Sequence, residues 1–252
     1  MDPGPDQIVK LSVFAGVATV TLDSQPNRNA LSHQLVAGLG ERLDAIEATD
    51  GVRVVVLTHA GPAFCAGADL KERSSGKPDS GPFVRILGRL MDAKQPTIAA
   101  VDGAVRAGGI GLMASCDLVV VHRSVTFALT EVRIGVAPAI ISVPILRRVG
   151  SSRIAAAMLT GEPFGAEEAR SIGLITHVSD DVAATTAALC AAIVAGAPRA
   201  VAETKRLLHR VPGLDRSTAF VQMRALSDEL FSGPDAAEGM AAFREKRTPN
   251  WT

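Results

Sequence analysis

The 252-residue sequence has few cysteines, no net charge and no long apolar run. Its three cysteines, Cys65, Cys116 and Cys190, lack the spacing of a disulfide framework, which indicates reduced thiols and a cytoplasmic protein. Lysine plus arginine and aspartate plus glutamate both number 26, which argues against a broad nucleic-acid or membrane surface. No apolar run reaches the roughly 18 residues of a membrane-spanning helix, and no signal peptide is visible. We therefore expect neither a nucleic-acid partner nor a membrane.

Motifs for metal and serine chemistry are also missing. None of the five histidines forms a His-x-x-His pair or stands near a cysteine at metal-binding spacing. The sequence has no G-x-S-x-G motif of the kind that acyl-serine hydrolases carry. We therefore expect no metal ion and no acyl-serine intermediate.

What is present is the pattern of an α/β protein. Apolar residues make up 47% of the chain and charged residues 21%, an ordinary globular composition with enough apolar surface for a large core. Strand, loop and helix patterns alternate, which predicts a parallel sheet, and helices dominate after residue 141. We expect strands at residues 8–14, 17–22, 52–57, 97–101, 118–122 and 174–178. We expect one helix capped by Ser32 and further helices at 83–92 and 110–115. Between these elements we expect a loop at 59–71, a mobile polar stretch at 72–81 and a turn at 103–109.

Two glycine-bearing loops, residues 61–70 and 101–111, each follow a predicted buried strand. In open α/β sheets, ligands bind at the carboxyl ends of strands, and small residues let a ligand approach the backbone. Free N–H groups at a helix start favour negative charge. Two such loops from adjacent strands can aim two N–H groups at one oxygen, which is an oxyanion hole. The same glycines also fit tight turns or close helix–strand packing, and both interpretations stay open.

Residues 109–114 match the G-x-G-x-x-A fingerprint of dinucleotide sites. Such a site also requires an acidic residue at the end of the next strand to hold the ribose. This chain has His122 and Arg123 there, so the match is weak and we expect no dinucleotide cofactor.

Glu131 follows an apolar stretch, residues 127–129. If it is buried, its pKa rises, which suits general acid–base chemistry. The alternative is a helix-start acid that follows a Thr130 cap, and the local sequence alone favours this second interpretation.

From about residue 8 to residue 251, the chain resembles the crotonase superfamily, also called the enoyl-CoA hydratase/isomerase family. The resemblance extends over nearly the whole sequence, and its motifs together are highly specific. They are Asn29-Ala30-Leu31, residues 63–71, 98–103, 107–109, 116–117, 127–135 and 159–161, Ala169, Gly173-Leu174 and the tail at 239–247.

The resemblance implies an α/β fold with a crotonase-like spiral of stacked ββα turns. The core would span residues 1–195 and hold the acyl-CoA site. A C-terminal helical region, residues 196–252, would build a homotrimer or a dimer of trimers. Coenzyme A would be part of the substrate, with no other cofactor.

The resemblance also implies roles for individual residues. The backbone N–H groups of Ala68 and Gly108 would bind the thioester oxygen, and Glu131 would move protons. Lys71 and Arg28 would contact the phosphates, although both also fit a solvated surface. The remaining substrate-binding positions are Ala66, Gly67, Asp69, Leu70, Gly109 and Gly111.

Gly111 is the main departure from the family pattern. The best-known hydratases carry one glutamate there and a second at the position of Glu131, whereas Gly111 cannot titrate. We therefore expect a hydratase-type lyase that adds water to a 2-enoyl-CoA with Glu131 as acid and base. The alternative within the family is a double-bond isomerase, which needs only one base. The alternative of another class is a non-catalytic CoA- or RNA-binding relative.

Overall fold

The computed structural model describes residues 7–75 and 79–251. The chain divides into two compact units, Met1–Ala191 and Ala192–Thr252. No single helix in the described ranges is long and apolar enough to cross a membrane.

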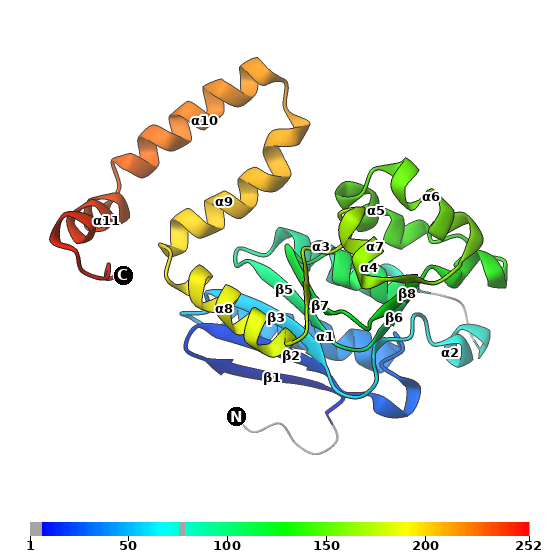
Figure 1. The fold of residues 1–252 in the computed structure, drawn as a ribbon. Helices are drawn as coiled ribbons and strands as arrows, with labels where there is room; N and C mark the ends of the chain where they lie inside the picture. The colour runs from blue at the N-terminus through cyan, green and yellow to red at the C-terminus, as the bar shows by residue number, and fades with distance from the viewer. Residues whose placement is uncertain (1–6, 76–78, 252) are drawn as a thin grey trace. The chain divides into compact units, whose positions relative to one another are not determined.

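A six-stranded sheet forms the centre of the first unit (Figure 1). Its inner strands β3, β5 and β7 are parallel, and their runs of valine, isoleucine and alanine are buried as expected for a sheet covered on both faces. The hairpin of β1 and β2 adds two strands at one edge, and β10 pairs in parallel with β7 at the other. The strands are β1 (Val9–Phe14), β2 (Val17–Leu22), β3 (Val54–His59), β5 (Thr97–Val101), β7 (Leu118–His122) and β10 (His177–Ser179).

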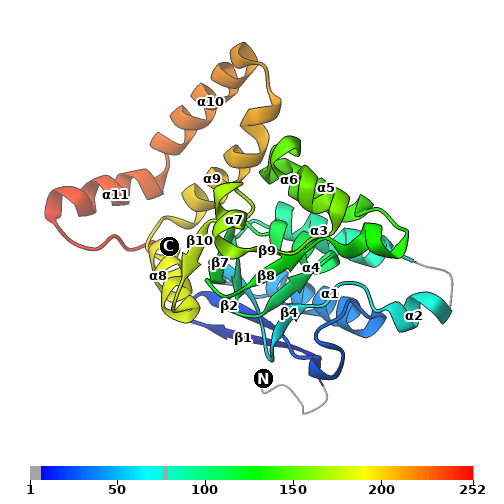
Figure 2. The ribbon, with the colours of Figure 1, turned by 45° about the vertical axis from the view of Figure 1, so that its right-hand side comes forward.

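A second sheet contains four short strands in the order β4-β6-β8-β9. Three of them, β4, β8 and β9, are labelled in Figure 2. The four strands are β4 (Ala63–Cys65), β6 (Ala104–Arg106), β8 (Thr126–Ala128) and β9 (Phe164–Gly165). Each of β3, β5 and β7 is followed by one strand of this second sheet and then by helix. The predicted α/β spiral of stacked ββα turns is therefore confirmed.

The sequence prediction missed the short strands. It gave a loop at residues 59–71 and a turn at residues 103–109, which contain β4 and β6. Strands of three residues are too short for side-chain alternation to distinguish them from loops. Their pairing depends on contacts between distant parts of the chain.

The helix after Ser32 is confirmed as α1 (His33–Glu47). The Ser32 hydroxyl accepts the Leu35 N–H at 3.2 Å, and an apolar stripe from Leu35 to Ile46 is buried. Helix α3 (Gly81–Asp92) packs against α1. Further helices of this unit are α2 (Leu70–Ser75), α4 (Gly108–Ala114), α5 (Ala139–Arg148), α6 (Ser151–Thr160) and α7 (Ala166–Ser171), and α8 (Val182–Val194) begins in it.

Two further predictions need correction. In the polar stretch predicted to be mobile at 72–81, residues 72–75 are helical and belong to α2, which Asp69 caps by accepting the N–H of Lys71 at 3.0 Å. Residues 76–78 of that predicted segment lie outside the described residues. The strand expected at 174–178 begins only at His177, because Leu174 closes the end of α7 by donating its N–H to Ala169.

The second unit is helical, with α9 (Pro198–Arg210), the 3-10 turn η3 (Val211–Gly213), α10 (Arg216–Phe231) and α11 (Pro234–Glu245). Asp215 caps α10 by accepting the Thr218 N–H at 3.0 Å. Phe220, Phe231 and Phe243 are each at least 70% exposed. Such exposed aromatic side chains suit a helical region that packs against other copies, and trimer formation stays a prediction.

Candidate active site

A cavity of about 690 Å³ lies in the first unit. It is lined by the loop that follows β4, by the start of α4 and by the segment that follows β8. These segments meet because β4, β6 and β8 are parallel neighbours, so their carboxyl ends lie at one edge of the sheet. Phe83, Ile134, Ile140 and Ile141 contribute apolar wall.

The orientation of the Ala68 amide is fixed by the preceding residue. Gly67 has φ +94°, a left-handed conformation that glycine adopts without strain. Its carbonyl oxygen accepts the Leu31 N–H at 2.8 Å. Because a trans peptide directs its C=O and N–H to opposite sides, the Ala68 N–H points away from Leu31. Within the described residues, this N–H donates to no backbone or side-chain acceptor.

The Gly108 amide is fixed in a similar way. Ala107 has φ 47° and ψ −118°, a strained conformation that costs on the order of 1–3 kcal/mol for a residue other than glycine. Its N–H donates to the Ala128 carbonyl at 2.9 Å, and its own carbonyl accepts the Ile110 N–H at 2.9 Å. The N–H of Gly108 therefore points out of α4, and no acceptor for it is found in the described part of the chain.

The two loops touch each other. A Cβ atom built on Gly67 would lie only 2.9 Å from the Ala107 Cβ. Ala68 and Gly108 both line the cavity, and each directly follows one of these touching residues. Two unpaired N–H groups at one cavity wall have the chemistry of an oxyanion hole, which stabilises negative charge as it forms on a carbonyl oxygen.

Glu131 lies in the same cavity, on the 3-10 turn η2 (Thr130–Ile134). Its carboxyl is half-buried, and Oε2 has no hydrogen-bond partner among the described residues. Burial raises the pKa of this carboxyl above its usual range. The Thr130 cap favoured by the local sequence is wrong, because Leu129 occupies the cap position and no side chain caps the turn.

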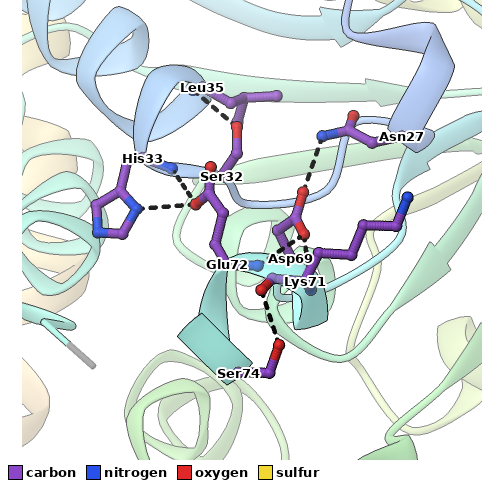
Figure 3. Close-up of polar contacts among 8 residues, drawn as sticks. All are labelled: Asn27, Ser32, His33, Leu35, Asp69, Lys71, Glu72 and Ser74. Atoms are coloured by element: carbon purple, nitrogen blue, oxygen red, sulfur yellow. Dashed lines mark hydrogen bonds and ion pairs between the residues drawn. The ribbon is translucent and has the colours of Figure 1, made fainter. Parts of the chain in front are cut away.

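The rim of the cavity is tied together by α2 (Figure 3). Glu72 Oε2 accepts the backbone N–H of His33 at 2.8 Å and lies 2.8 Å from its Nδ1. Asp69 Oδ2 accepts a hydrogen bond from Asn27 Nδ2 at 3.3 Å. The Glu72 contacts join α2 to the start of α1, and the Asp69–Asn27 bond joins the residue before α2 to the 3-10 turn Gln25–Asn27. His33, Asp69 and Glu72 all line the cavity.

Gly111 lies behind the cavity wall, against Ile141 of α5. A Cβ atom on Gly111 would lie 2.6 Å from the Cβ of Ile141 and 3.2 Å from its Cα. A longer side chain at this position therefore requires Ile141 to move. Ile141 is 4% exposed and lines the cavity, so the space that a second carboxyl would need is filled by hydrocarbon.

Only some of the predicted site residues line the cavity. Ala66, Ala68, Asp69, Leu70, Gly108 and Glu131 line it. Gly67, Gly109 and Gly111 are buried behind it, and Lys71 and Arg28 are exposed side chains that do not line it. Phosphate contacts of Lys71 and Arg28 therefore stay a prediction. No cluster of possible metal ligands is found in the described ranges.

Sequence reasoning did not identify His33 or Ile141 as parts of the site. In sequence, His33 resembles an ordinary surface residue and Ile141 an ordinary core residue. The only signal was the glycine at position 111, which implies a close neighbour without indicating which residue it is.

A family model described as "Enoyl-CoA hydratase/isomerase" matches residues 13–252. The chain belongs to the enoyl-CoA hydratase/isomerase family. The resemblance to the crotonase superfamily is thereby confirmed.

Individual members of this family match over nearly their whole length. "Enoyl-CoA hydratase EchA19" of Mycobacterium tuberculosis is 33% identical, with 100% of this chain and 98% of the relative covered. "Mevalonyl-coenzyme A hydratase sidH" of Aspergillus fumigatus is 34% identical, with 93% and 91% covered. The crystal structure of an enoyl-CoA hydratase from Mycobacterium smegmatis has a TM-score of 0.90 at 32% identity, with 97% and 98% covered.

Proposed function

We propose that this enoyl-CoA hydratase/isomerase family member is a hydratase that adds water to a 2-enoyl-CoA, with Glu131 as acid and base. The observation that carries the proposal is the shared cavity. It combines a Glu131 carboxyl oxygen with the amides of Ala68 and Gly108, and none of these three groups has a hydrogen-bond partner among the residues that the structure describes. The hydratase names of the relatives support the same reaction.

The amides stabilise the transition state. As the thioester becomes an enolate, negative charge moves to the thioester oxygen, where the Ala68 and Gly108 N–H groups donate to it. Both amides are fixed before the substrate arrives, so little reorganisation is needed. Each donor of this kind contributes about 3–4 kcal/mol to lowering the barrier.

Glu131 moves the protons. Its carboxylate accepts a proton from water while the water oxygen bonds to the β-carbon and the α,β double bond becomes the enolate. The protonated Glu131 then donates to the α-carbon, which yields the 3-hydroxyacyl thioester and restores the carboxylate. A raised pKa suits a group that is a base in one step and an acid in the next.

Double-bond isomerisation is a second candidate, favoured by Ile141 over Gly111. In that reaction Glu131 takes a proton from the α-carbon of a 3-enoyl thioester. It returns the proton to the γ-carbon through the same oxyanion-stabilised dienolate. No water has to be held, so an apolar wall suits this reaction.

The remaining proposals concern the setting of the site. The substrate supplies coenzyme A, no other cofactor takes part, and the enzyme acts in the cytoplasm as a homotrimer or a dimer of trimers. A non-catalytic CoA- or RNA-binding role is the alternative of another class, and turnover of an enoyl thioester by the purified protein would exclude it.

The test is incubation of 2-enoyl and 3-enoyl thioesters in water labelled with heavy oxygen. Label in a 3-hydroxyacyl product supports hydration. Bond migration without label supports the isomerase. Thioester turnover that survives Glu131→Gln undiminished contradicts both assignments.

A further inference from the structure

Cys65 is the last residue of β4 and contacts the residue before Ala68 and the residue after Gly108. Its side chain is fully buried and is not part of the cavity lining. The Sγ atom accepts the Gly67 N–H at 3.4 Å. This bond fixes the peptide between Ala66 and Gly67, one residue before the peptide that carries the Ala68 N–H.

The same side chain supports the second loop. A Cβ atom on Gly109 would lie 2.7 Å from the Cys65 Cβ and 3.2 Å from its Sγ, so the backbone of α4 rests on this cysteine. Gly109 directly follows Gly108 in α4. One buried side chain therefore contacts the segments on both sides of the proposed oxyanion hole.

Cys65 does not take part in the chemistry itself. Burial raises the pKa of its thiol to about 12, so the thiolate that a nucleophile needs is not formed near neutral pH. The side chain is also fully buried and does not line the cavity.

We propose that Cys65 is a positioning residue that holds the Ala68 and Gly108 amides at the separation needed to bind one oxygen. This inference rests on the proposed oxyanion hole. Replacing the thiol by hydrogen removes the Gly67 contact and leaves space beneath α4, so the two amides no longer converge. A serine at position 65 keeps an acceptor for the Gly67 N–H, so it keeps most of the alignment of the two amides.

The test compares Cys65→Ala and Cys65→Ser with Cys190→Ala, a matched change of a buried cysteine in α8. The probe is butyryl-CoA labelled with carbon-13 at its carbonyl, which has no double bond to react. Hydrogen bonds from an oxyanion hole shift this carbonyl signal downfield. The carbonyl shift and the kcat and KM for an enoyl thioester are measured together.

We expect Cys65→Ala to lose most of the downfield shift and to lower kcat about 10- to 100-fold, with KM changed less than about twofold. Cys65→Ser keeps more than half of the shift, and Cys190→Ala keeps all of it. A shift in Cys65→Ala equal to that of Cys190→Ala overturns the proposal. The proposal is also overturned if Cys65→Ser has the wild-type melting temperature but loses the downfield shift. This second comparison decides the question if Cys65→Ala does not fold.

The wild-type protein separates this inference from the proposed function. If bound butyryl-CoA shows no downfield shift in the wild type, the oxyanion hole itself is wrong. If the wild type shows the shift and Cys65→Ala keeps it, the oxyanion hole stands and only the role of Cys65 is wrong.

Discussion

Ile141 packs directly onto Gly111, with its Cβ 2.6 Å from where a Cβ of residue 111 would lie. The two positions therefore form one packing unit between α4 and α5. A glycine at 111 leaves room for the branched side chain at 141, and that side chain supplies apolar wall to the cavity. The departure from the two-glutamate pattern thus involves two residues, and reversing it requires both to change.

The first prediction concerns this pair. Gly111→Glu alone forces Ile141 out of its place and lowers the free energy of unfolding by about 1–3 kcal/mol. In an Ile141→Ala background the same glutamate costs less, because the space that it needs is already open. Urea unfolding of the two single variants and the double variant measures this coupling. A coupling energy of zero contradicts the packing described here.

The second prediction is that Glu131→Gln lowers kcat about 10²- to 10⁴-fold, because glutamine cannot exchange a proton. KM changes little, since the side chain keeps its size and its place in the cavity. Glu41→Gln, an exposed change in α1, is the matched control and leaves both constants unchanged. Equal activities of the two variants would remove Glu131 from the mechanism.

The third prediction is the pH dependence of the reaction. Burial raises the pKa of Glu131, so its carboxylate is protonated at a higher pH than an exposed glutamate. Because the free enzyme needs the carboxylate to accept the first proton, kcat/KM falls as the pH drops through this raised pKa. In a pH profile of the wild type, we expect this fall in kcat/KM to occur above the ordinary pKa of glutamate, and we expect the Glu131→Gln profile to lack it. A fall centred on the ordinary glutamate pKa would contradict the prediction.

The fourth prediction concerns the rim. Glu72→Ala removes the acceptor that joins α2 to the start of α1. Its carboxyl is 38% exposed, so unfolding becomes easier by only about 1 kcal/mol or less. KM rises several-fold while kcat changes little, because the residue lines the cavity without a part in the proton transfers. Glu72→Gln, which keeps an oxygen acceptor, has a KM closer to the wild type. A fall in kcat at constant KM contradicts this role.

The fifth prediction is a loss of stability in mild acid through His59. Its side chain is 0% exposed, and burial lowers its pKa although Asp102, 2.7 Å away, opposes the shift. At pH values above the pKa of His59 in the unfolded chain, near 6.5, the imidazole is neutral in both the folded and the unfolded state. Its contribution to the free energy of unfolding is then fully present. As the pH falls below that value, the unfolded chain binds a proton first and the free energy of unfolding declines. In urea unfolding at several pH values, we expect the free energy of unfolding to decline less steeply with falling pH in His59→Gln than in the wild type. Equal declines in the two proteins would refute this role of His59.

Much of the fold follows from local patterns in the sequence. The valine-rich strand β3 and the apolar stripe of α1 are buried on the faces that their periods predict. The strands β4 and β6 could not be predicted from local patterns, because they form by pairing between segments that are distant in sequence. Leu174 was assigned to a strand although it closes α7, since an apolar residue fits either place.

The candidate site was predictable to a similar extent. The two glycine loops and Glu131 were found in the sequence because their motifs resemble a known family. Ile141 and Cys65 were not assigned these roles, because each acts through a contact with a glycine that is distant in sequence. Such contacts depend on how α4 packs against α5 and β4, which no local pattern encodes.

A crystal structure with a bound acyl-CoA tests the proposed oxyanion hole directly. We expect the thioester oxygen to lie about 2.7–3.2 Å from the backbone nitrogens of both Ala68 and Gly108. We also expect the Glu131 carboxyl to face the acyl carbons. A thioester oxygen bound to neither nitrogen, or a Glu131 carboxyl turned away from the acyl chain, would contradict the proposal.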